Sequence, residues 1–234
     1  MKNFIKEIFE KYGFNLNEKQ IEQFAVYMDF LLQENQKYNL TAITDEREVV
    51  IKHFVDSVLP LSEISQNASV IDVGTGAGFP GVPLKILRPD IKLTLLDSLQ
   101  KRINFLGQLL TKLEIDNVDR IHSRAEDYAL KMRENFDVAL SRAVAGVPTL
   151  SEYLIPFVKV GGKVLMYKGS SADEELKAGE KAILTLGGKV EKVVNFSLKE
   201  VESERNIVVI KKINKTDKKY PRGKNLPKIK PILK

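Results

Sequence analysis

The sequence contains no cysteine and only two histidines among its 234 residues. The missing cysteines exclude a disulfide framework, a thiolate nucleophile and a cysteine-ligated zinc site. Two histidines make a metal site built from imidazoles an unpromising prediction. No apolar run approaches the length of about 18 residues that a membrane-spanning helix needs, and the N-terminal residues lack the apolar segment of a secretory signal. We therefore expect a soluble, cytoplasmic, monomeric protein that binds neither a membrane nor a metal.

Positive charge is distributed unevenly along the chain. The formal net charge is +6, yet residues 211–234 alone carry nine lysines and one arginine against one aspartate. Pro221, Pro227 and Pro231 interrupt this basic segment. Such a tail is either a phosphate-binding arm or a solvated extension. Beside a nucleotide-binding type of fold, we favour contact with RNA or DNA.

The most informative stretch is a glycine-rich loop that follows an apolar strand expected over residues 69–73. Glycine occurs at Gly74, Gly76, Gly78 and Gly81. Glycine allows positive φ and lets a ligand approach the backbone closely. Pro80 fits the first turn of the helix that follows, whose N-terminus offers free N–H groups. This strand–loop–helix pattern predicts a nucleotide-type binding site.

Two ligand classes fit the loop. Gly76-x-Gly78-x-x-Gly81 matches the dinucleotide fingerprint, and Asp97 lies about 20 residues further on, where a ribose-binding acid is expected. The offset pattern, Asp72 followed by Gly74-x-Gly76-x-Gly78, fits S-adenosylmethionine (SAM), with Asp72 near the ammonium of the methionine moiety. A carboxylate directly before the loop would repel a pyrophosphate. Asp72 therefore favours SAM.

Strands alternate with helices from residue 69 onward, which predicts a parallel sheet with helices on both faces. We expect strands at 69–73, 91–96, 117–122, 136–140, 163–167, 189–197 and 205–211. The last two can pair as a hairpin, which would make the final strand antiparallel, as in SAM methyltransferases. Helical spacing predicts three helices before the sheet: a short one that Gly13 ends, one that Asn17 and Gln20 cap, and one from Thr44 or Asp45 to Leu59.

The predicted fold is therefore the α/β, Rossmann-like fold of class I SAM-dependent methyltransferases, a mostly parallel seven-stranded sheet with an antiparallel C-terminal hairpin. We divide the chain into an N-terminal helical region packed on the core (1–62), a SAM-binding methyltransferase domain (63–212) and a basic C-terminal tail (213–234).

Ligands of open α/β sheets bind at the carboxyl ends of the strands. Asp97 ends the second strand and can accept hydrogen bonds from both ribose hydroxyls. After the third strand, Glu126 or Asp127, with the backbone of Ala125, is placed to recognise an adenine edge. In the helix before the sheet, His53, Asp56 and Ser57 share one side. A hydrolase triad would also need a nucleophile elbow and an oxyanion hole, so these residues either pack a polar face or line the ligand cleft.

Residue types and motifs that the sequence lacks reduce the number of possible methyl acceptors. Cytosine carbon-5 methylation uses a cysteine nucleophile, and there is none. Adenine amino methylation typically uses Asn/Asp-Pro-Pro-aromatic after the fourth strand, where this chain has Ser141-Arg142-Ala143-Val144. Ribose methylation needs a base to help remove a proton. A guanine N7 has an exposed lone pair and no proton, so we assign no catalytic base.

These residues resemble the bacterial RsmG/GidB family of 16S rRNA guanine-N7 methyltransferases. The main evidence is Asp72 to Pro83, with its unusual Phe79-Pro80-Gly81-Val82-Pro83 continuation. Similar blocks run in order through nearly the whole chain: Asn39-Leu40-Thr41, 53–57, Asp97-Ser98, 101–106, Arg124-Ala125-Glu126, Ser141-Arg142-Ala143, Lys168-Gly169 and Tyr220-Pro221-Arg222. In one departure, Asn225 stands roughly where the family pattern leads us to expect a glycine.

The resemblance implies SAM as the cofactor and methyl transfer to N7 of guanine 527, in the 530 loop of 16S rRNA, which would yield 7-methylguanosine. With the glycine loop, the expected SAM-binding residues are Gly74, Gly76, Gly78, Phe79, Asp97, Ala125, Glu126 and Arg142. The residues expected to face RNA of the small ribosomal subunit are Asn39, His53, Lys168, Arg205 and Arg222. Two alternatives stay open: an NAD-dependent oxidoreductase, and a non-catalytic rRNA-binding assembly protein.

Overall fold

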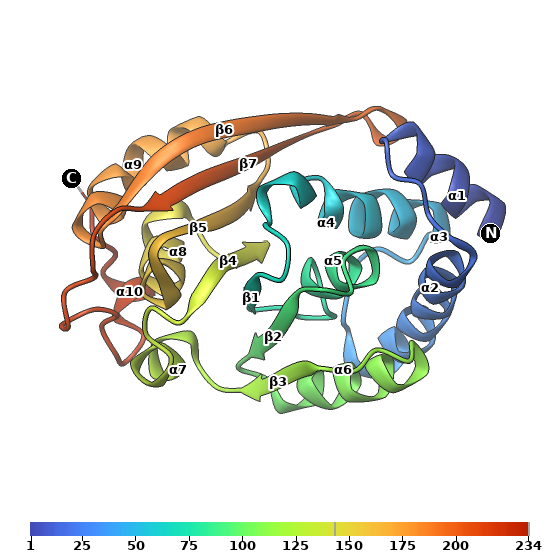
Figure 1. Cartoon of the computed structure of the whole chain (residues 1–234), viewed down its shortest axis with the longest axis horizontal. Helices are drawn as coiled ribbons and strands as arrows, with labels where there is room; N and C mark the ends of the chain where they lie inside the picture. The colour runs from blue at the N-terminus through green and yellow to red at the C-terminus, as the bar shows by residue number, and fades with distance from the viewer. Residues whose placement is uncertain (143, 234) are drawn as a thin grey trace.

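The computed structural model describes residues 1–142 and 144–233, and its centre is one seven-stranded sheet of order β3-β2-β1-β4-β5-β7-β6 (Figure 1). The strands are β1 (Ser69–Val73), β2 (Lys92–Asp97), β3 (Val118–His122), β4 (Phe136–Arg142), β5 (Val158–Lys168), β6 (Gly188–Leu198) and β7 (Ser203–Lys212). The first five pair in parallel, and β7 runs antiparallel to both β5 and β6. The predicted parallel sheet with a closing hairpin is confirmed.

Side chains of the central strands alternate between two cores, one on each face of the sheet. In β4, Val138 and Leu140 belong to one core and Ala139 to the other. Continuous apolar strands of this kind are typical of sheets that are covered on both sides. The first core includes residues of α2 (Glu18–Tyr38), α5 (Gly81–Leu87) and α6 (Gln100–Lys112). The second includes residues of α7 (Ala125–Lys131), α8 (Val147–Leu154) and α9 (Ala172–Thr185).

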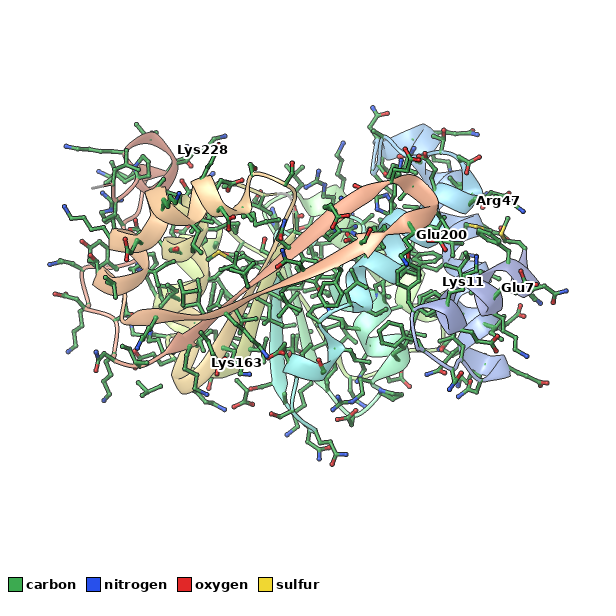
Figure 2. All side chains as sticks on the ribbon, turned by 90° about the horizontal axis from the view of Figure 1, so that it is seen from above. Glu7, Lys11, Arg47, Lys163, Glu200 and Lys228 are labelled. Carbon is green, nitrogen blue, oxygen red and sulfur yellow. The ribbon has the colours of Figure 1, made fainter. Side chains whose placement is uncertain are left out.

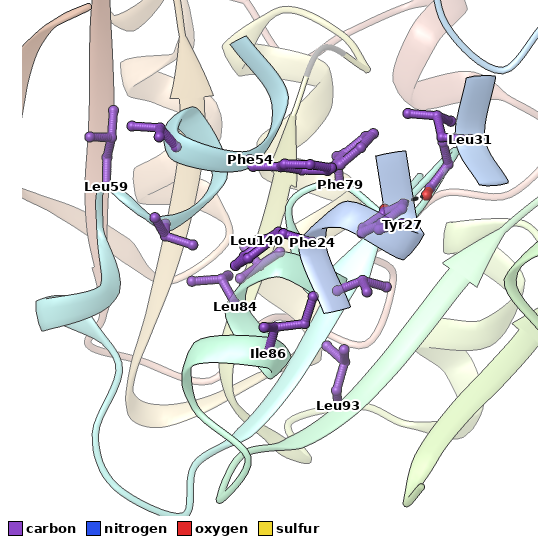
Figure 3. Close-up of a cluster of buried hydrophobic side chains, with 14 of the residues drawn as sticks. Phe24, Tyr27, Leu31, Phe54, Leu59, Phe79, Leu84, Ile86, Leu93 and Leu140 are labelled. Carbon is purple, nitrogen blue, oxygen red and sulfur yellow. Dashed lines mark hydrogen bonds between the residues drawn. The ribbon is translucent and has the colours of Figure 1, made fainter. Parts of the chain in front are cut away.

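The N-terminal helices are part of the first core. Gly13, with φ of +82°, follows α1 (Lys2–Lys11), and Asn17 and Gln20 form the predicted capping box of α2. Tyr27 of α2 is fully buried and stacks on Phe79 with ring centroids 5.2 Å apart (Figure 3). Its hydroxyl donates to the carbonyl oxygen of Ala77 at 2.6 Å. Thus α2 holds the glycine loop through both a ring contact and a hydrogen bond.

The third predicted helix has the expected extent but not a uniform winding. Asp45 caps α3 (Glu46–Glu48), which continues as the π-helix η1 (Val49–Val55) and then as α4 (Asp56–Val58). The Phe54 ring of the π-helical turn packs 5.0 Å from Phe24 and 5.1 Å from Tyr27. Hydrophobic spacing over so few residues does not distinguish a π-helical turn from an α-helical one, because both bury a similar stripe.

The β6–β7 hairpin extends across the molecule to the N-terminal helices (Figure 2). At its tip, the short 3₁₀ helix η4 (Lys199–Val201) carries Glu200, which accepts a 2.5 Å hydrogen bond from the Tyr12 hydroxyl. The Lys11 ammonium lies 3.5 Å from the same carboxylate. The N-terminal helices and the closing hairpin are therefore linked directly as well as through the core.

One predicted strand boundary differs in the structure. Gly161 and Gly162 were predicted to lie before the fifth strand, but β5 runs through them with an irregular register against β4. A Cβ on Gly162 would lie 2.5 Å from the carbonyl oxygen of Asp137, so this crossing requires glycine. Helix α6 starts at Gln100 with Leu99 as N-cap, because the Asp97 carboxylate accepts from the Leu99 N–H outside the helix.

The basic C-terminal segment packs against the core of the sheet domain instead of extending as a solvated arm. The Arg222 guanidinium makes a two-pronged ion pair with Glu152, whose side chain is fully buried on α8. Arg133 donates to the carbonyl oxygens of Thr216 and Tyr220. Short helix α10 (Leu226–Ile229) then lies beside α8 (Figure 1). Composition alone predicted either a phosphate-binding arm or a solvated tail, because it does not reveal which acids are buried and need a basic partner.

We expect Tyr27→Phe to destabilise the protein by about 1–3 kcal/mol, because it leaves the buried Ala77 carbonyl without its hydrogen-bond donor. Urea unfolding would measure this loss. Tyr38→Phe is the matched control, since the Tyr38 hydroxyl donates no hydrogen bond within the described residues, and it should change stability by less than about 0.5 kcal/mol. Equal losses in the two variants would contradict the role assigned to Tyr27.

Candidate functional site

Two carboxylates hold the glycine loop between β1 and α5. Asp72 accepts from the Thr75 hydroxyl at 2.7 Å and from the Gly81 N–H at 2.9 Å. On the other side, Asp97 accepts from the Gly76 N–H at 2.9 Å. The protein's own side chains therefore fix the loop backbone, as preorganised binding requires.

One glycine of the loop shows why the sequence needs this residue type. Gly78 has φ of +102°, and a Cβ there would lie 2.6 Å from the Tyr27 hydroxyl oxygen. Gly76 also has a positive φ, of +61°, but the atom nearest to a Cβ at that position would be a carbonyl oxygen 3.9 Å away, so its outer side is open. Gly78 thus serves packing, and Gly76 leaves room above the loop.

Asp72 lies deeper than the sequence predicted. It was expected near the methionine end of the ligand, but its side chain is fully buried and borders none of the three cavities described below. Burial raises the pKa of Asp72 to about 7. Its second oxygen, Oδ1, has no hydrogen-bond partner within the described residues. Because the carboxylate binds the first N–H of α5, it occupies the helix N-terminus on which a dinucleotide pyrophosphate would have to sit.

Three adjoining cavities lie at the carboxyl ends of the strands. The Glu126 cavity, of about 330 Å³, is bordered by residues that include Gly74, Asp97, Ala125, Glu126, Tyr153 and Asn225. The Gly76 cavity, of about 450 Å³, is bordered by residues that include Thr41, Gly74, Gly76, Phe79, Asp97 and Arg102. The Asp56 cavity, of about 570 Å³, is bordered by residues that include His53, Asp56, Arg142, Lys168, Glu175 and Arg205. Val144 borders all three, so the cavities adjoin one another at this residue.

The Glu126 cavity resolves an alternative that the sequence left open. Glu126 borders it with a side chain that is only 3% exposed, and accepts from Arg124 Nε at 2.8 Å. Asp127 is exposed and does not border it. Of the two acids, Glu126 is therefore the one in position to face a ligand there.

Asp97 stands between the first two cavities. Its Oδ2 accepts from Gly76 N–H and from Arg102 at 3.2 Å, and its Oδ1 accepts from Leu99 N–H at 2.9 Å. These contacts fix the plane of the carboxylate. A carboxylate offers about four acceptor positions, so it retains capacity for a ligand hydroxyl.

Arg142, at the end of β4, organises the boundary between the Gly76 and Asp56 cavities. It donates to Asp56 Oδ2 at 2.7 Å and to His53 Nδ1 at 3.1 Å. Its guanidinium lies 4.9 Å above the Phe79 ring, on which His53 also stacks. Burial, with the charge of Arg142, lowers the pKa of His53 to about 3.

This contact fixes the tautomer of His53. Arginine only donates, so Nδ1 accepts and the proton of the neutral ring is on Nε2. Nε2 lies 2.7 Å from the Thr41 hydroxyl, which is the remaining partner of the ring. Both ring nitrogens are therefore engaged within the protein.

The polar side formed by His53, Asp56 and Ser57 lines the cleft and is not a triad. Asp56 is buried and also accepts from Arg205 at 3.0 Å. Ser57 donates to the backbone carbonyl of His53 and makes no contact with its ring. Of the two interpretations that the sequence allowed, the cleft lining describes His53 and Asp56, and internal packing describes Ser57.

The residues predicted to face RNA are not all placed alike. His53, Lys168 and Arg205 border the Asp56 cavity, whereas Asn39 is exposed at the C-cap of α2. The buried Lys168 ammonium binds Glu175 at 2.7 Å and the carbonyl oxygen of Ala145 at 2.6 Å.

Arg222 stays a predicted RNA contact, although its guanidinium is bound to Glu152 and to the carbonyl oxygen of Lys230. In this structure it docks the tail instead of presenting a free cation. Two residues of the predicted blocks and tail, Ala143 and Lys234, lie outside the described residues.

Three residues of the site had no sequence signal strong enough to single them out, namely Tyr27, Arg102 and Tyr153, and Asn225 was noted only as a departure from the family pattern. Most of their contacts in the site are with groups far away in the chain. Over residues 1–142 and 144–233, no group of three or more His, Asp or Glu side chains is arranged to hold a metal ion. Within the same ranges, no helix has the length and apolar character needed to cross a membrane.

Comparison with known proteins gives a consistent result. The family model for GidB, described as rRNA small subunit methyltransferase G, matches residues 20–208. A protein of Oceanobacillus iheyensis named ribosomal RNA small subunit methyltransferase G is 49% identical over 233 residues, which cover 98% of each chain. A protein of the same name from Lactobacillus johnsonii is 48% identical, again over 98% of each chain.

Solved structures support the fold. The Aeropyrum pernix fibrillarin complex with SAM matches with a TM-score of 0.52 and 14% identity, covering 67% of this chain and 73% of fibrillarin. The precorrin-6y C5,15-methyltransferase of Geobacter metallireducens matches with a TM-score of 0.50 and 18% identity, covering 67% and 87%. At such identities these matches show a shared Rossmann-like methyltransferase fold.

The buried Asp72 predicts a specific pH dependence of stability. Its pKa is about 7 in the folded state against an ordinary value of 3.8, so between these pH values the folded protein binds an extra proton. The stabilisation is present in full below about pH 4 and is lost as pH rises through 7. Asp72→Asn keeps the acceptor for Thr75 and Gly81 but cannot titrate.

We therefore expect the free energy of unfolding of the wild type, relative to Asp72→Asn, to fall between pH 5 and pH 8. The fall is at most about 1.4 kcal/mol for each unit of pKa shift. Urea unfolding of both proteins at the two pH values, without added SAM, would measure it. Parallel pH profiles would show that Asp72 is ionised at both pH values.

Proposed function

This chain belongs to the GidB family, rRNA small subunit methyltransferase G, and we propose that it methylates N7 of guanine 527 in the 530 loop of 16S rRNA. It is a SAM-dependent methyltransferase of small-subunit rRNA, since near-complete relatives carry that name and the fold is that of SAM methyltransferases. The proposal concerns the acceptor atom, its position in the RNA and the residues that act.

The choice of N7 as the acceptor rests on the hydrogen bonds of His53, which leave its ring without a free lone pair. An acceptor that must lose a proton, such as a ribose hydroxyl, needs a base with a free lone pair. Among the described residues, His53 is the only imidazole that borders these cavities, and its accepting nitrogen is bound by Arg142. Asp56 is engaged by two guanidinium groups. Guanine N7 has a lone pair and no proton, so it can be methylated here without a base.

We assign each part of the cofactor to one of the adjoining cavities, or to the residue between them, according to the side chains that line them. The adenine fits the Glu126 cavity, the ribose fits Asp97, and the methionine moiety follows the glycine loop in the Gly76 cavity, next to Phe79. SAM, when bound, supplies a methyl group that its sulfonium already activates. The chain contributes alignment, because it holds the acceptor in line with the bond that breaks.

The Asp56 cavity, which adjoins the Gly76 cavity at His53 and Arg142, would then hold the target guanine. Methyl transfer to N7 would require no proton to be removed there, so no residue of this cavity would have to act as a base. The methylated guanine carries a positive charge, which unpaired guanidinium groups would oppose. Asp56 pairs with both Arg142 and Arg205, so its carboxylate reduces the positive charge at this position.

The wider assignments follow from this placement. Residues 1–62 supply His53 and Asp56 and would form the RNA-facing wall, residues 63–212 would bind SAM, and residues 213–234 would complete the cofactor side. The proposed RNA contacts are Asn39, His53, Lys168, Arg205 and Arg222. We further propose that the protein acts as a monomer in the cytoplasm, on the small ribosomal subunit or its RNA.

The proposed reaction is tested by transfer of labelled methyl from SAM to small ribosomal subunits that lack endogenous methylation. We expect label in 7-methylguanosine, located at guanine 527 by chemical cleavage of the methylated RNA. Subunits that already carry the modification are the control and should accept no label. Label in another nucleoside would contradict N7, and 7-methylguanosine elsewhere would contradict the position.

We expect Arg142→Ala to weaken SAM binding by roughly tenfold or more, since it removes the group that positions His53 and Phe79 beside the glycine loop. The protein should stay folded, because Arg205 still pairs with Asp56. Calorimetric titration would measure the affinity. Arg205→Ala is the matched control: it also removes one partner of Asp56 but should leave SAM affinity within about twofold. Wild-type affinity of Arg142→Ala would refute this role.

A further inference from the structure

The docked C-terminal segment forms part of the wall of the Glu126 cavity. Asn225 and Lys228 border this cavity together with Ala125, Glu126 and Tyr153, although Asn225 lies 101 residues beyond its partner Arg124. The segment is held there by the Arg222–Glu152 ion pair and by a hydrogen bond from the Thr149 hydroxyl to the carbonyl oxygen of Pro227. The cavity is therefore incomplete without the tail.

The orientation of the Asn225 amide is determined by its neighbours. Its oxygen, Oδ1, accepts from Arg124 Nη2 at 3.0 Å, and the Tyr153 hydroxyl lies 3.4 Å from the same oxygen. Because arginine can only donate, the oxygen must face Arg124 and the amide nitrogen must face away from it. That NH₂ group has no hydrogen-bond partner within the described residues. The two N–H groups of the Asn225 amide thus lie on a partly buried wall of the cavity as unused hydrogen-bond donors.

The local backbone gives a second, independent observation. Asn225 is the N-cap of α10, a position where asparagine normally accepts a hydrogen bond from the first turn, yet its side chain makes no such bond. It also has φ of +58°, a conformation that glycine adopts freely and asparagine tolerates. Neither helix capping nor the turn conformation therefore explains why this position carries an amide side chain. Its contacts are instead with two residues that border the cavity.

One guanidinium, that of Arg124, holds two residues that border the Glu126 cavity. Arg124 donates through Nε to Glu126 and through Nη2 to Asn225. It thereby fixes the positions of two groups on the same cavity. They are the Glu126 carboxylate, at the start of α7, and the Asn225 amide, from the tail. This arrangement suits a flat heterocycle that offers both acceptor and donor atoms at its edges, which is the description of adenine.

Resting on the proposed function, we propose that Asn225 binds the adenine of SAM, by donating a hydrogen bond from Nδ2 to an adenine ring nitrogen. The tail is then a structural part of the cofactor site and not only a basic extension. Docking of the tail and binding of adenosine are linked, because a ligand that binds only the docked form stabilises that form.

The test compares two variants with two ligands. Asn225→Asp keeps the shape and the contact with Arg124 but replaces the donor by an acceptor, and Asn225→Gly keeps the backbone conformation but removes the side chain. The ligands are S-adenosylhomocysteine and 5′-methylthioadenosine, which share the adenosine but differ in the methionine part. We expect both variants to lose roughly three- to tenfold or more in affinity, the effect of one hydrogen bond, and to lose equally for both ligands.

Two controls separate binding from folding. Lys230→Ala, which changes a tail side chain that does not border the cavity, should bind both ligands as the wild type does. The thermal midpoint of Asn225→Asp, measured without added ligand, should match that of the wild type. In addition, S-adenosylhomocysteine should slow tryptic cleavage of the wild-type tail and do so less in Asn225→Asp.

The outcomes distinguish this inference from the proposed function. Unchanged affinity in both variants, or a loss confined to S-adenosylhomocysteine, would overturn the role of Asn225 and leave the methyltransferase assignment intact. Failure of the wild-type protein to bind either ligand would overturn both.

Discussion

The site depends above all on the contact between Arg142 and the helix that carries Asp56. Arg142 is the last residue of β4, and its guanidinium binds Asp56, the His53 ring and the backbone carbonyl of Lys52. These partners belong to the N-terminal helices, with Lys52 lying 90 residues earlier in the chain. The interaction therefore joins the N-terminal region to the strand ends, keeps His53 neutral on Phe79, and places Arg142 beside both the proposed cofactor space and the proposed acceptor space.

The two ends of the chain complete the sheet from opposite sides. A bare Rossmann-like sheet offers a glycine loop and a row of acidic strand ends, which can hold a cofactor but form only part of an enclosure. Here the N-terminal helices supply the wall with His53 and Asp56, and the C-terminal tail supplies the wall with Asn225. Both additions are fixed by ion pairs to buried acids, Asp56 and Glu152, because a buried carboxylate without a partner is costly.

Sequence patterns predicted the structural features that depend on residues close together in the chain. The apolar runs indicated the seven strands, the hairpin followed from the short spacing of the last two, and Asn17 and Gln20 formed the expected cap. Patterns could not predict pairings between distant residues. Nothing near Arg222 in the sequence shows that Glu152 is buried and needs a cation, and nothing near Asp72 shows that α5 covers it. Adjacent acids such as Glu126 and Asp127 could be distinguished only once the helix α7 placed one inward and one outward.

The most direct test of this account is a crystal structure of the protein with S-adenosylhomocysteine bound. The account predicts the adenine between Glu126 and Asn225, the ribose at Asp97, and the sulfur at the Gly76 cavity beside Phe79, with the Asp56 cavity left open for a base. A ligand with its adenine outside the Glu126 cavity, or one whose sulfur is shielded by Arg142 from the Asp56 cavity, would contradict the proposed order of cofactor and acceptor.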